Sequence, residues 1–315
     1  MNDRVQNLFQ GLSRVLPLVA TLSTACSGGT QVPGSAALDS KVNGSISGSF
    51  LVNEITPNTQ VIVGTEGLEL FLGQAPGLEV LEKIARTFSD DVWICAPAEE
   101  QSGAGHSLTL GRPVRLRQHD ERRFSVSGTP TDSVMMALRK VLPGKPDLIL
   151  SGVNRGANLG DDVTYSGTVS AAIEGALAGI RSIALSQVYA KEGMGDRVPF
   201  AAAEAWGAKV IAPLLGLPFA ERTLVNVNFP PIAAAEVQGI RVVRQGFHDY
   251  ARGSVVEGTD PRGYQYFWFG LHGIEHTPGH QTDLEAIQDG YVSVTPLQLD
   301  LTHNASLAQL AERFA

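Results

Sequence analysis

A short apolar run that passes directly into a loop of small polar residues constrains this chain more than any other stretch. The run covers residues 148–150, and residues 151–162 after it read Ser-Gly-Val-Asn-Arg-Gly-Ala-Asn-Leu-Gly-Asp-Asp. An apolar run of this length is typical of a buried parallel strand. Glycines let the backbone approach a ligand closely, and Asn and Asp supply oxygen ligands for a hard cation. We therefore predict a strand that ends in a ligand-binding loop.

The loop leads into a helix with hydroxyl side chains at its start. Ser166, Gly167 and Thr168 precede a run with small and apolar residues at helical spacing. Hydroxyls and free N–H groups at a helix start favour a bound anion, most often phosphate. Oxygen ligands beside such a cradle indicate metal-assisted phosphoryl chemistry. The alternative is a glycine-rich loop capped by Ser and Thr that binds no ligand.

Strands and helices alternate over most of the chain. Predicted strands cover residues 60–63, 92–95, 114–116, 124–126, 148–150, 182–186 and 223–228. Predicted helices cover residues 78–88, 128–142 and 200–215. This alternation predicts an α/β fold with a three-layer Rossmann-like core, a parallel sheet between helices, and ligand sites at the carboxyl ends of the strands. Segments 239–244, 264–269 and 290–295 predict a β-rich, antiparallel carboxyl-terminal extension, and residues 302–314 a closing helix.

The first 58 residues differ in composition from the rest. Two arginines and the apolar residues 15–22 precede Cys26, and a Gly/Ser-rich stretch follows. This layout is that of a secretory or lipoprotein signal and also that of an unprocessed leader. We expect residues 1–58 to be a signal-like or disordered leader with a flexible linker. Residues 59–315 then form the functional domain, with an oligomerisation arm at about 239–300.

Charge and cysteine content exclude several classes of protein. The chain has 315 residues, a formal charge of −8 and two cysteines. An acidic chain lacks the basic footprint of a nucleic-acid-binding protein, and two cysteines provide neither a disulfide framework nor a Cys-based metal motif. The leader's apolar run is too short to span a bilayer. We expect a cytoplasmic location, or a periplasmic or lipid-anchored one if the leader is a functional signal.

Several motifs in the same order resemble the SurE (survival protein E) family of metal-dependent 5'-nucleotidases. Besides the stretch at 148–175, the matching motifs are Gly-Thr-Pro-Thr-Asp at 128–132, Asp-Pro-Arg-Gly at 260–263 and the segment 290–297. The resemblance covers roughly residues 75–301. It implies hydrolysis of a nucleoside 5'-monophosphate to nucleoside and phosphate by a homodimer or homotetramer. A bound Mg²⁺ or Mn²⁺ would polarise the phosphoryl oxygens and lower the pKa of a water.

The resemblance also implies a metal site. Ser102 matches the serine of the family's Ser-Gly-Ala loop, and Asn154 matches the asparagine of its Ser-Gly-Val-Asn segment. The family's Asn-Asp-Asp-Gly turn after the first strand is absent, and residues 61–78 read VIVGTEGLELFLGQAPGL instead. Glu66 follows the strand and is the candidate for the missing carboxylate ligand. The phosphate would be held by Ser166, Gly167, Thr168 and Asn158.

Histidines offer two further candidates. His106 lies in the same polar loop as Ser102, at residues 96–110 (the Ser102 loop). It is a candidate general acid toward the leaving nucleoside oxygen, although a loop histidine can also be only a solvated residue. His272, His276 and His280 have a spacing of four residues, which would suit a metal site on a helix. Glycine and proline between them break such a helix, so we expect a polar loop.

Two other functions remain open from the sequence. Without its carboxylate pair, the chain could be a catalytically impaired phosphate or nucleotide binder with the same fold. A dinucleotide-dependent oxidoreductase ranks lower, because residues 152–160 read GVNRGANLG rather than G-x-G-x-x-G and no acidic residue follows at the expected place. Metal-dependent turnover separates the 5'-nucleotidase from the catalytically impaired binder.

Overall fold

The structure is a computed structural model that describes residues 61–63, 76–188, 200–248, 253–271 and 281–315. These residues belong to one compact unit that spans residues 47–315. The predicted leader therefore lies outside the described residues.

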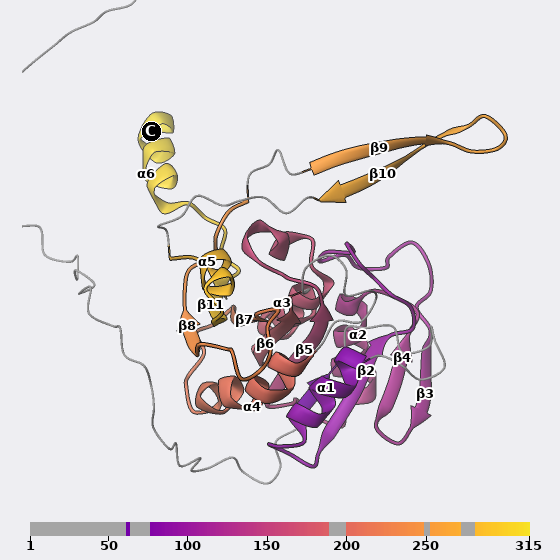
Figure 1. Ribbon diagram of the computed structural model, residues 1–315, viewed down its shortest axis with the longest axis vertical. Coiled ribbons are helices and arrows are strands. Elements are labelled where there is room, and N and C mark those ends of the chain that lie inside the picture. The colour runs from indigo at the N-terminus through magenta and orange to yellow at the C-terminus, as the bar shows by residue number, and fades with distance from the viewer. Residues whose placement is uncertain (1–60, 64–75, 189–199, 249–252, 272–280) are drawn as a thin grey trace, which may run out of the picture. The chain divides into compact units, whose positions relative to one another are not determined.

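A nine-stranded sheet forms the middle layer (Figure 1), with the strand order β3-β4-β2-β1-β5-β6-β7-β11-β8. The strands from β4 to β7 run parallel, whereas β3 is antiparallel to β4 and β11 is antiparallel to β7. The bounds are β1 (Val61–Val63), β2 (Val92–Pro97), β3 (Leu116–Asp120), β4 (Arg123–Val126), β5 (Leu148–Arg155), β6 (Arg181–Gln187), β7 (Thr223–Phe229), β8 (Ile240–Val242) and β11 (Val292–Gln298).

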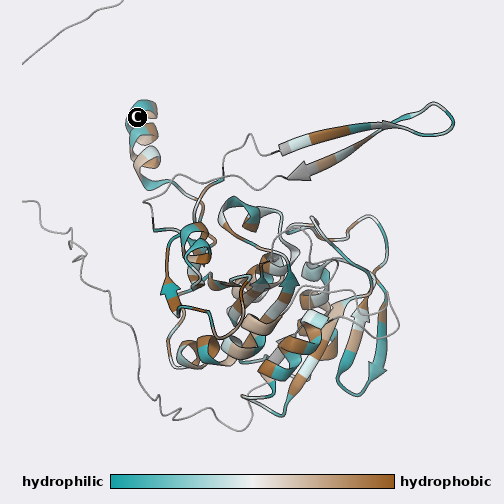
Figure 2. Ribbon diagram, in the orientation of Figure 1, coloured by the Kyte–Doolittle hydropathy of each residue, from teal (hydrophilic) through white to brown (hydrophobic). Residues whose placement is uncertain are grey.

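Helices cover both faces of this sheet. On one face lie α1 (Pro76–Ala85) and α4 (Ala201–Leu215), and on the other lie α2 (Pro130–Met136), its π-helical continuation η1 (Ala137–Val141), and α3 (Gly167–Leu177). Alternation along β5 shows why the strand is apolar throughout. Leu148 and Leu150 pack with α1, whereas Ile149 packs with α2 and α3. Figure 2 shows hydrophobic residues along the strands and helices of this core.

The remaining elements follow β7 or connect the core. They are the 3-10 helix η2 (Gly160–Thr164), the helices α5 (Asp283–Gln288) and α6 (Asn304–Phe314), and the antiparallel hairpin of β9 (Gly253–Thr259) and β10 (Gln265–Leu271). None of the helices among the described residues has the length and apolar character needed to cross a membrane.

The predicted α/β fold with a parallel sheet and a β-rich extension is confirmed, with local corrections. The helix predicted over 128–142 is split into α2 and η1, and the strand predicted over 114–116 instead covers Leu116–Asp120. In the extension, β8 runs parallel to β11, which an all-antiparallel arm would not allow. Neither β9 nor α5 was predicted.

The chain order predicts a crevice beside β1. From β1 the chain passes through α1 to β2 on one side, and later enters β5 on the other side, from which α3 follows on the opposite face. Connections that leave neighbouring strands toward opposite faces open a gap at the carboxyl ends of those strands, where α/β proteins bind ligands. The carboxyl ends of β1 and β5 are therefore the first place to look for a site.

Candidate functional site

Three sequence motifs lie at the carboxyl ends of the parallel strands, here called the carboxyl edge of the sheet. Ser102 follows β2, Asn154 lies near the end of β5, and Ser166 precedes α3. Because β2 and β5 flank β1, their axes are about 10 Å apart, twice the spacing of neighbouring strands. A ligand contributed from the chain that follows β1 would enter between Ser102 and Asn154.

Asn154 belongs to the strand rather than to a loop after it, which corrects the predicted end of the strand. The pairing of β5 with β6 gains one residue between Ser151 and Asn154, so that Asn154 pairs with Ser186. Such a bulge re-aims a side chain at the edge of a sheet. The Asn154 amide nitrogen donates to the carbonyl oxygen of Gly156 at 3.0 Å, which leaves its amide oxygen as a hard ligand atom.

Two side chains of the Ser102 loop have acidic partners that were not predicted. The Ser102 hydroxyl donates to Glu100 Oε1 at 2.9 Å. His106 Nε2 lies 3.2 Å from Oε2 of Glu174, which belongs to α3. Glu174 was missed because its significance comes only from the fold, which brings α3 beside this loop.

Contacts between backbones join the Ser102 loop to the start of α3. The Gly105 N–H donates to the Tyr165 carbonyl oxygen at 3.1 Å. A Cβ atom at Gly167 would lie 2.9 Å from Pro130 Cγ and 3.6 Å from the carbonyl oxygen of Gln101. Gly167 is therefore required by close packing of three motifs, and the structure brings the Ser102 loop and residues 166–168 together.

The start of α3 has the geometry predicted for an anion cradle. Ser166 is the N-cap, and its hydroxyl oxygen accepts a hydrogen bond from the Val169 N–H at 3.0 Å. The N–H groups of Gly167 and Thr168 have no acceptor within the helix because they belong to its first turn. Two amide donors and a hydroxyl at the positive end of a helix dipole suit a phosphate.

The side chain of Asn158 is hydrogen-bonded to the sheet. Its side-chain nitrogen donates to Ser186 Oγ at 2.7 Å, and its backbone N–H donates to Asn228 Oδ1 at 2.9 Å. Its carbonyl oxygen accepts from the amides of Asn226 and Asn228. Asn158 is 6% exposed. These contacts favour a role in fixing the loop on β6 and β7 over direct contact with phosphate.

A buried carboxylate fastens the other end of the Ser102 loop. Asp132 accepts hydrogen bonds from the backbone N–H groups of Thr109 and Thr129 at 3.1 and 2.8 Å, and from the Thr109 hydroxyl at 2.6 Å. Burial works to raise the pKa of Asp132, but these hydrogen bonds outweigh it and the pKa lies below its usual value. The Gly-Thr-Pro-Thr-Asp motif thus caps α2 and holds the loop that carries His106.

Some predicted residues lie outside the described part of the chain. These are Glu66, His272, His276 and His280. Within the described ranges, no three His, Cys, Asp or Glu side chains are grouped closely enough to hold a metal ion. Cys95 is buried, its thiol donates to the Ser133 carbonyl oxygen, and burial raises its pKa to about 12, which makes it a core residue.

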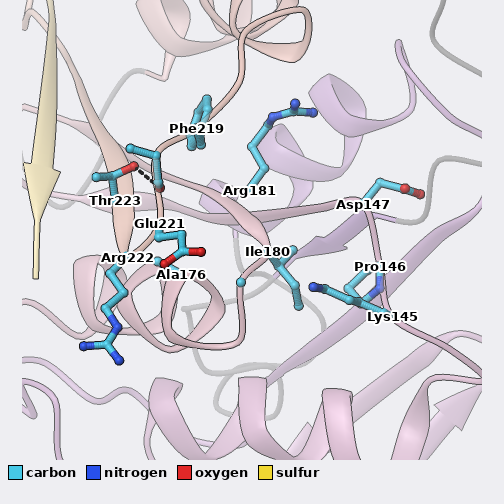
Figure 3. Close-up of a pocket in the computed structure, with 12 residues that line it drawn as sticks. Lys145, Pro146, Asp147, Ala176, Ile180, Arg181, Phe219, Glu221, Arg222 and Thr223 are labelled. Atoms are coloured by element: carbon cyan, nitrogen blue, oxygen red, sulfur yellow. Dashed lines mark hydrogen bonds between the residues drawn. The ribbon is translucent and has the colours of Figure 1, made fainter.

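A cavity of about 460 Å³ lies at the amino ends of the parallel strands, opposite the candidate site. It is lined by residues at the amino ends of β5, β6 and β7, among them Lys145, Arg181 and Arg222. Figure 3 shows the side chains of Arg181 and Arg222 pointing away from each other. Cations that diverge do not form an anion site, so this cavity does not compete with the carboxyl edge.

The matching family is described as Survival protein SurE, and its sequence model covers residues 66–252 of this chain. The chain belongs to the SurE family. A protein named 5'-nucleotidase SurE from Erythrobacter litoralis is 69% identical over 241 residues, which cover 76% of this chain and 95% of that protein. One of the same name from Rhizorhabdus wittichii is 64% identical over 235 residues, covering 74% and 92%. The crystal structure of the SurE protein from Aquifex aeolicus superposes with a TM-score of 0.69 at 36% identity, covering 82% of this chain and all of that one.

Replacing Asp132 tests whether it anchors the loop. We expect Asp132→Ala to lower the free energy of unfolding by about 2–4 kcal/mol, because the part-buried Thr109 N–H and the buried Thr129 N–H lose their acceptor. Urea unfolding followed by circular dichroism measures this. The control, Asp120→Ala, removes an exposed carboxylate on β3 and should change the free energy of unfolding by less than about 1 kcal/mol. Equal losses in the two variants would show that Asp132 is not an anchor.

Proposed function

We propose that the chain hydrolyses nucleoside 5'-monophosphates to nucleosides and phosphate at the carboxyl ends of β1, β2 and β5. The observation that carries this proposal is the meeting of the Ser102 loop, Asn154 and the start of α3 at that edge. Relatives named 5'-nucleotidase SurE, at up to 69% identity, support the same reaction.

The ligand atoms available at this edge are of the type that a hard divalent cation requires. Ser102 and Asn154 offer a hydroxyl and an amide oxygen, and Mg²⁺ and Mn²⁺ prefer oxygen ligands. Glu66 follows Val63, the last residue of β1, by three positions in the sequence and would supply a carboxylate. When bound, the ion would polarise the phosphoryl oxygens and lower the pKa of a water molecule.

The chain's own groups would bind and orient the substrate. The N–H groups of Gly167 and Thr168 and the Ser166 hydroxyl would hold the phosphoryl oxygens as charge develops on them. His106 would give its proton to the leaving nucleoside oxygen. Glu174 holds one nitrogen of that ring, so the other nitrogen, Nδ1, would face the substrate.

Phosphate release from a panel of nucleoside 5'-monophosphates tests the reaction. We expect turnover with Mn²⁺ or Mg²⁺ that a chelator abolishes, and turnover with only one of the two ions would identify the cofactor. Asn154→Ala should raise the ion concentration that gives half-maximal activity by about tenfold or more, because a ligand is lost. Glu66→Gln should do the same if Glu66 is a ligand.

The control for Asn154 is Gln118→Ala, which removes an exposed amide from the edge strand β3 and should leave the ion requirement unchanged. Folded protein that binds nucleotide without turning it over would instead support the catalytically impaired binder.

His106 and His119 form a matched pair for testing the proton donor. His106→Gln should lower kcat about 100-fold, because glutamine cannot transfer the proton. His119→Gln on β3 should leave kcat unchanged. Steady-state kinetics with one nucleotide measures both values. A His106→Gln enzyme that keeps kcat within about twofold of the unmodified chain would remove His106 from the mechanism.

The hairpin of β9 and β10 supports the homodimer or homotetramer expected from the sequence. Its side chains are exposed on both faces, with Trp268 68% and Phe269 88% exposed. A two-stranded hairpin alone is marginally stable in water, and exposed aromatic side chains in a row favour an interface. A second copy of this chain would cover them. The cytoplasmic location and the absence of a nucleic-acid partner stay predictions.

Light scattering after size-exclusion chromatography tests the role of the hairpin. We expect the double variant Trp268→Ser and Phe269→Ser to elute with a smaller mass than the unmodified chain, because the apolar contact area is lost. Leu217→Ser is the control, since Leu217 is also exposed but follows α4. An unchanged mass in the double variant would show that the hairpin does not join the subunits.

A further inference from the structure

The carboxylate of Asp283 has no exposed surface and takes no part in the proposed reaction. It is the first residue of α5 and is 0% exposed. Its Oδ2 accepts a hydrogen bond from the Gly160 N–H at 2.9 Å, and its Oδ1 accepts from the Gly246 N–H at 2.8 Å and the Leu284 N–H at 3.0 Å. One side chain thus joins three segments that are distant in sequence.

Asp283 binds the loop that follows β5 (residues 156–162, the signature loop) at Gly160. Gly160 has a positive φ of 54°, and a Cβ atom there would lie 3.2 Å from the Gly246 carbonyl oxygen. The Gly160 carbonyl oxygen accepts from Gln245 Nε2 at 2.9 Å. Both backbone polar groups of Gly160 are therefore fixed by residues outside the loop, and the positive φ is held from both sides.

The segment after β8 makes further contacts with the same loop. The His248 N–H donates to Asp161 Oδ1 at 2.9 Å, and His248 Nε2 lies 3.3 Å from Asp162 Oδ2. Asp161 and Asp162 thus contact the chain that follows β8. The 3-10 helix that contains them ends at Thr164, two residues before the N-cap Ser166.

We infer that Asp283 is a positioning residue that sets the direction in which the chain enters the phosphate cradle at the start of α3. Asp283 fixes Gly160 and thereby the 3-10 helix, and only Tyr165 separates that helix from Ser166. A small displacement of Gly160 therefore moves the Gly167 and Thr168 N–H groups. This inference rests on the proposed function, because it assigns the cradle to phosphate.

The hydrogen-bonding capacity of the Asp283 side chain fits this role. Burial raises its pKa, and the hydrogen bonds from the Gly160 and Gly246 N–H groups offset only part of that rise. Because backbone N–H groups need an acceptor and not a donor, an ionised carboxylate satisfies all of them whereas an amide does not. In Asp283→Asn, the amide nitrogen would face either Gly160 or Gly246 and remove one of the two ties.

The first readout does not depend on catalysis. Amide hydrogen exchange followed by mass spectrometry reports the peptide that contains Gly160. In the unmodified chain this peptide should be protected, and in Asp283→Asn its exchange should accelerate about tenfold or more relative to the peptides of β5 and β6. The control Asp289→Asn removes an exposed carboxylate from the end of the same helix, where it pairs with Arg241, and should leave the peptide unchanged.

The second readout is the concentration of inorganic phosphate that inhibits turnover by half. Asp283→Asn should raise this concentration and KM and lower kcat/KM by about 10-fold to 100-fold, because the cradle is misplaced. A variant that merely folds less completely would lower apparent kcat and leave both KM and the phosphate inhibition unchanged. Such a result, or unchanged exchange at Gly160, would overturn the inference.

Two outcomes separate this inference from the proposed function. If the unmodified chain shows no turnover, the proposed function fails, but hydrogen exchange still decides whether Asp283 fixes Gly160. If Asp283→Asn does not fold, the unmodified chain and Asp283→Glu decide, because the longer side chain keeps the carboxylate but moves it relative to the Gly160 N–H. Fast exchange at Gly160 in the unmodified chain, or unchanged exchange in Asp283→Glu, overturns the inference, and slow exchange that accelerates in Asp283→Glu supports it.

Discussion

The parallel pairing of β1 with both β2 and β5 is the constraint on which the whole site depends. Val61–Val63 hydrogen-bonds to both neighbours in register, so the carboxyl ends of three strands meet at one edge. The chain turns away from β1 and β5 toward opposite faces, which opens the crevice that the loops line. Without β1, β2 and β5 would not be joined in one sheet, and Ser102 and Asn154 would not be held at the same end of it. A three-residue strand therefore decides whether the loops form one site.

Two buried carboxylates turn that edge into a defined geometry. Asp132 holds the Ser102 loop through Thr109, and Asp283 holds the signature loop through Gly160. In both cases the partners include backbone N–H groups, whose acceptor must come from elsewhere in the chain. The loops that would touch substrate are thus fixed by residues that do not touch it.

Much of the fold was readable from the sequence because the core obeys simple periodicities. The apolar run at residues 148–150 predicted β5, and its length was underestimated because polar Asn154 continues the strand through a bulge. The start of α3 was predicted from Ser166, since a capping hydroxyl is a local signal. Glu174 and Asp283 were missed because their partners lie 68 and 123 residues away and no local pattern announces them. The partners of Asn158 on β6 and β7 likewise appear only after folding, and its assignment to phosphate stays a prediction.

The carboxyl-terminal segment is part of the site and not an appendage to it. The family match ends at residue 252, whereas β11 completes the sheet beside β7 and α5 supplies Asp283. A chain that ended there would leave the Gly160 N–H without its acceptor, and burial makes such a loss costly. The hairpin of β9 and β10 lies in sequence between that boundary and α5. If the hairpin joins two subunits, the strands that would contact the partner and the residue that fixes the loop belong to the same carboxyl-terminal part of the chain, with α5 beginning 12 residues after the end of β10.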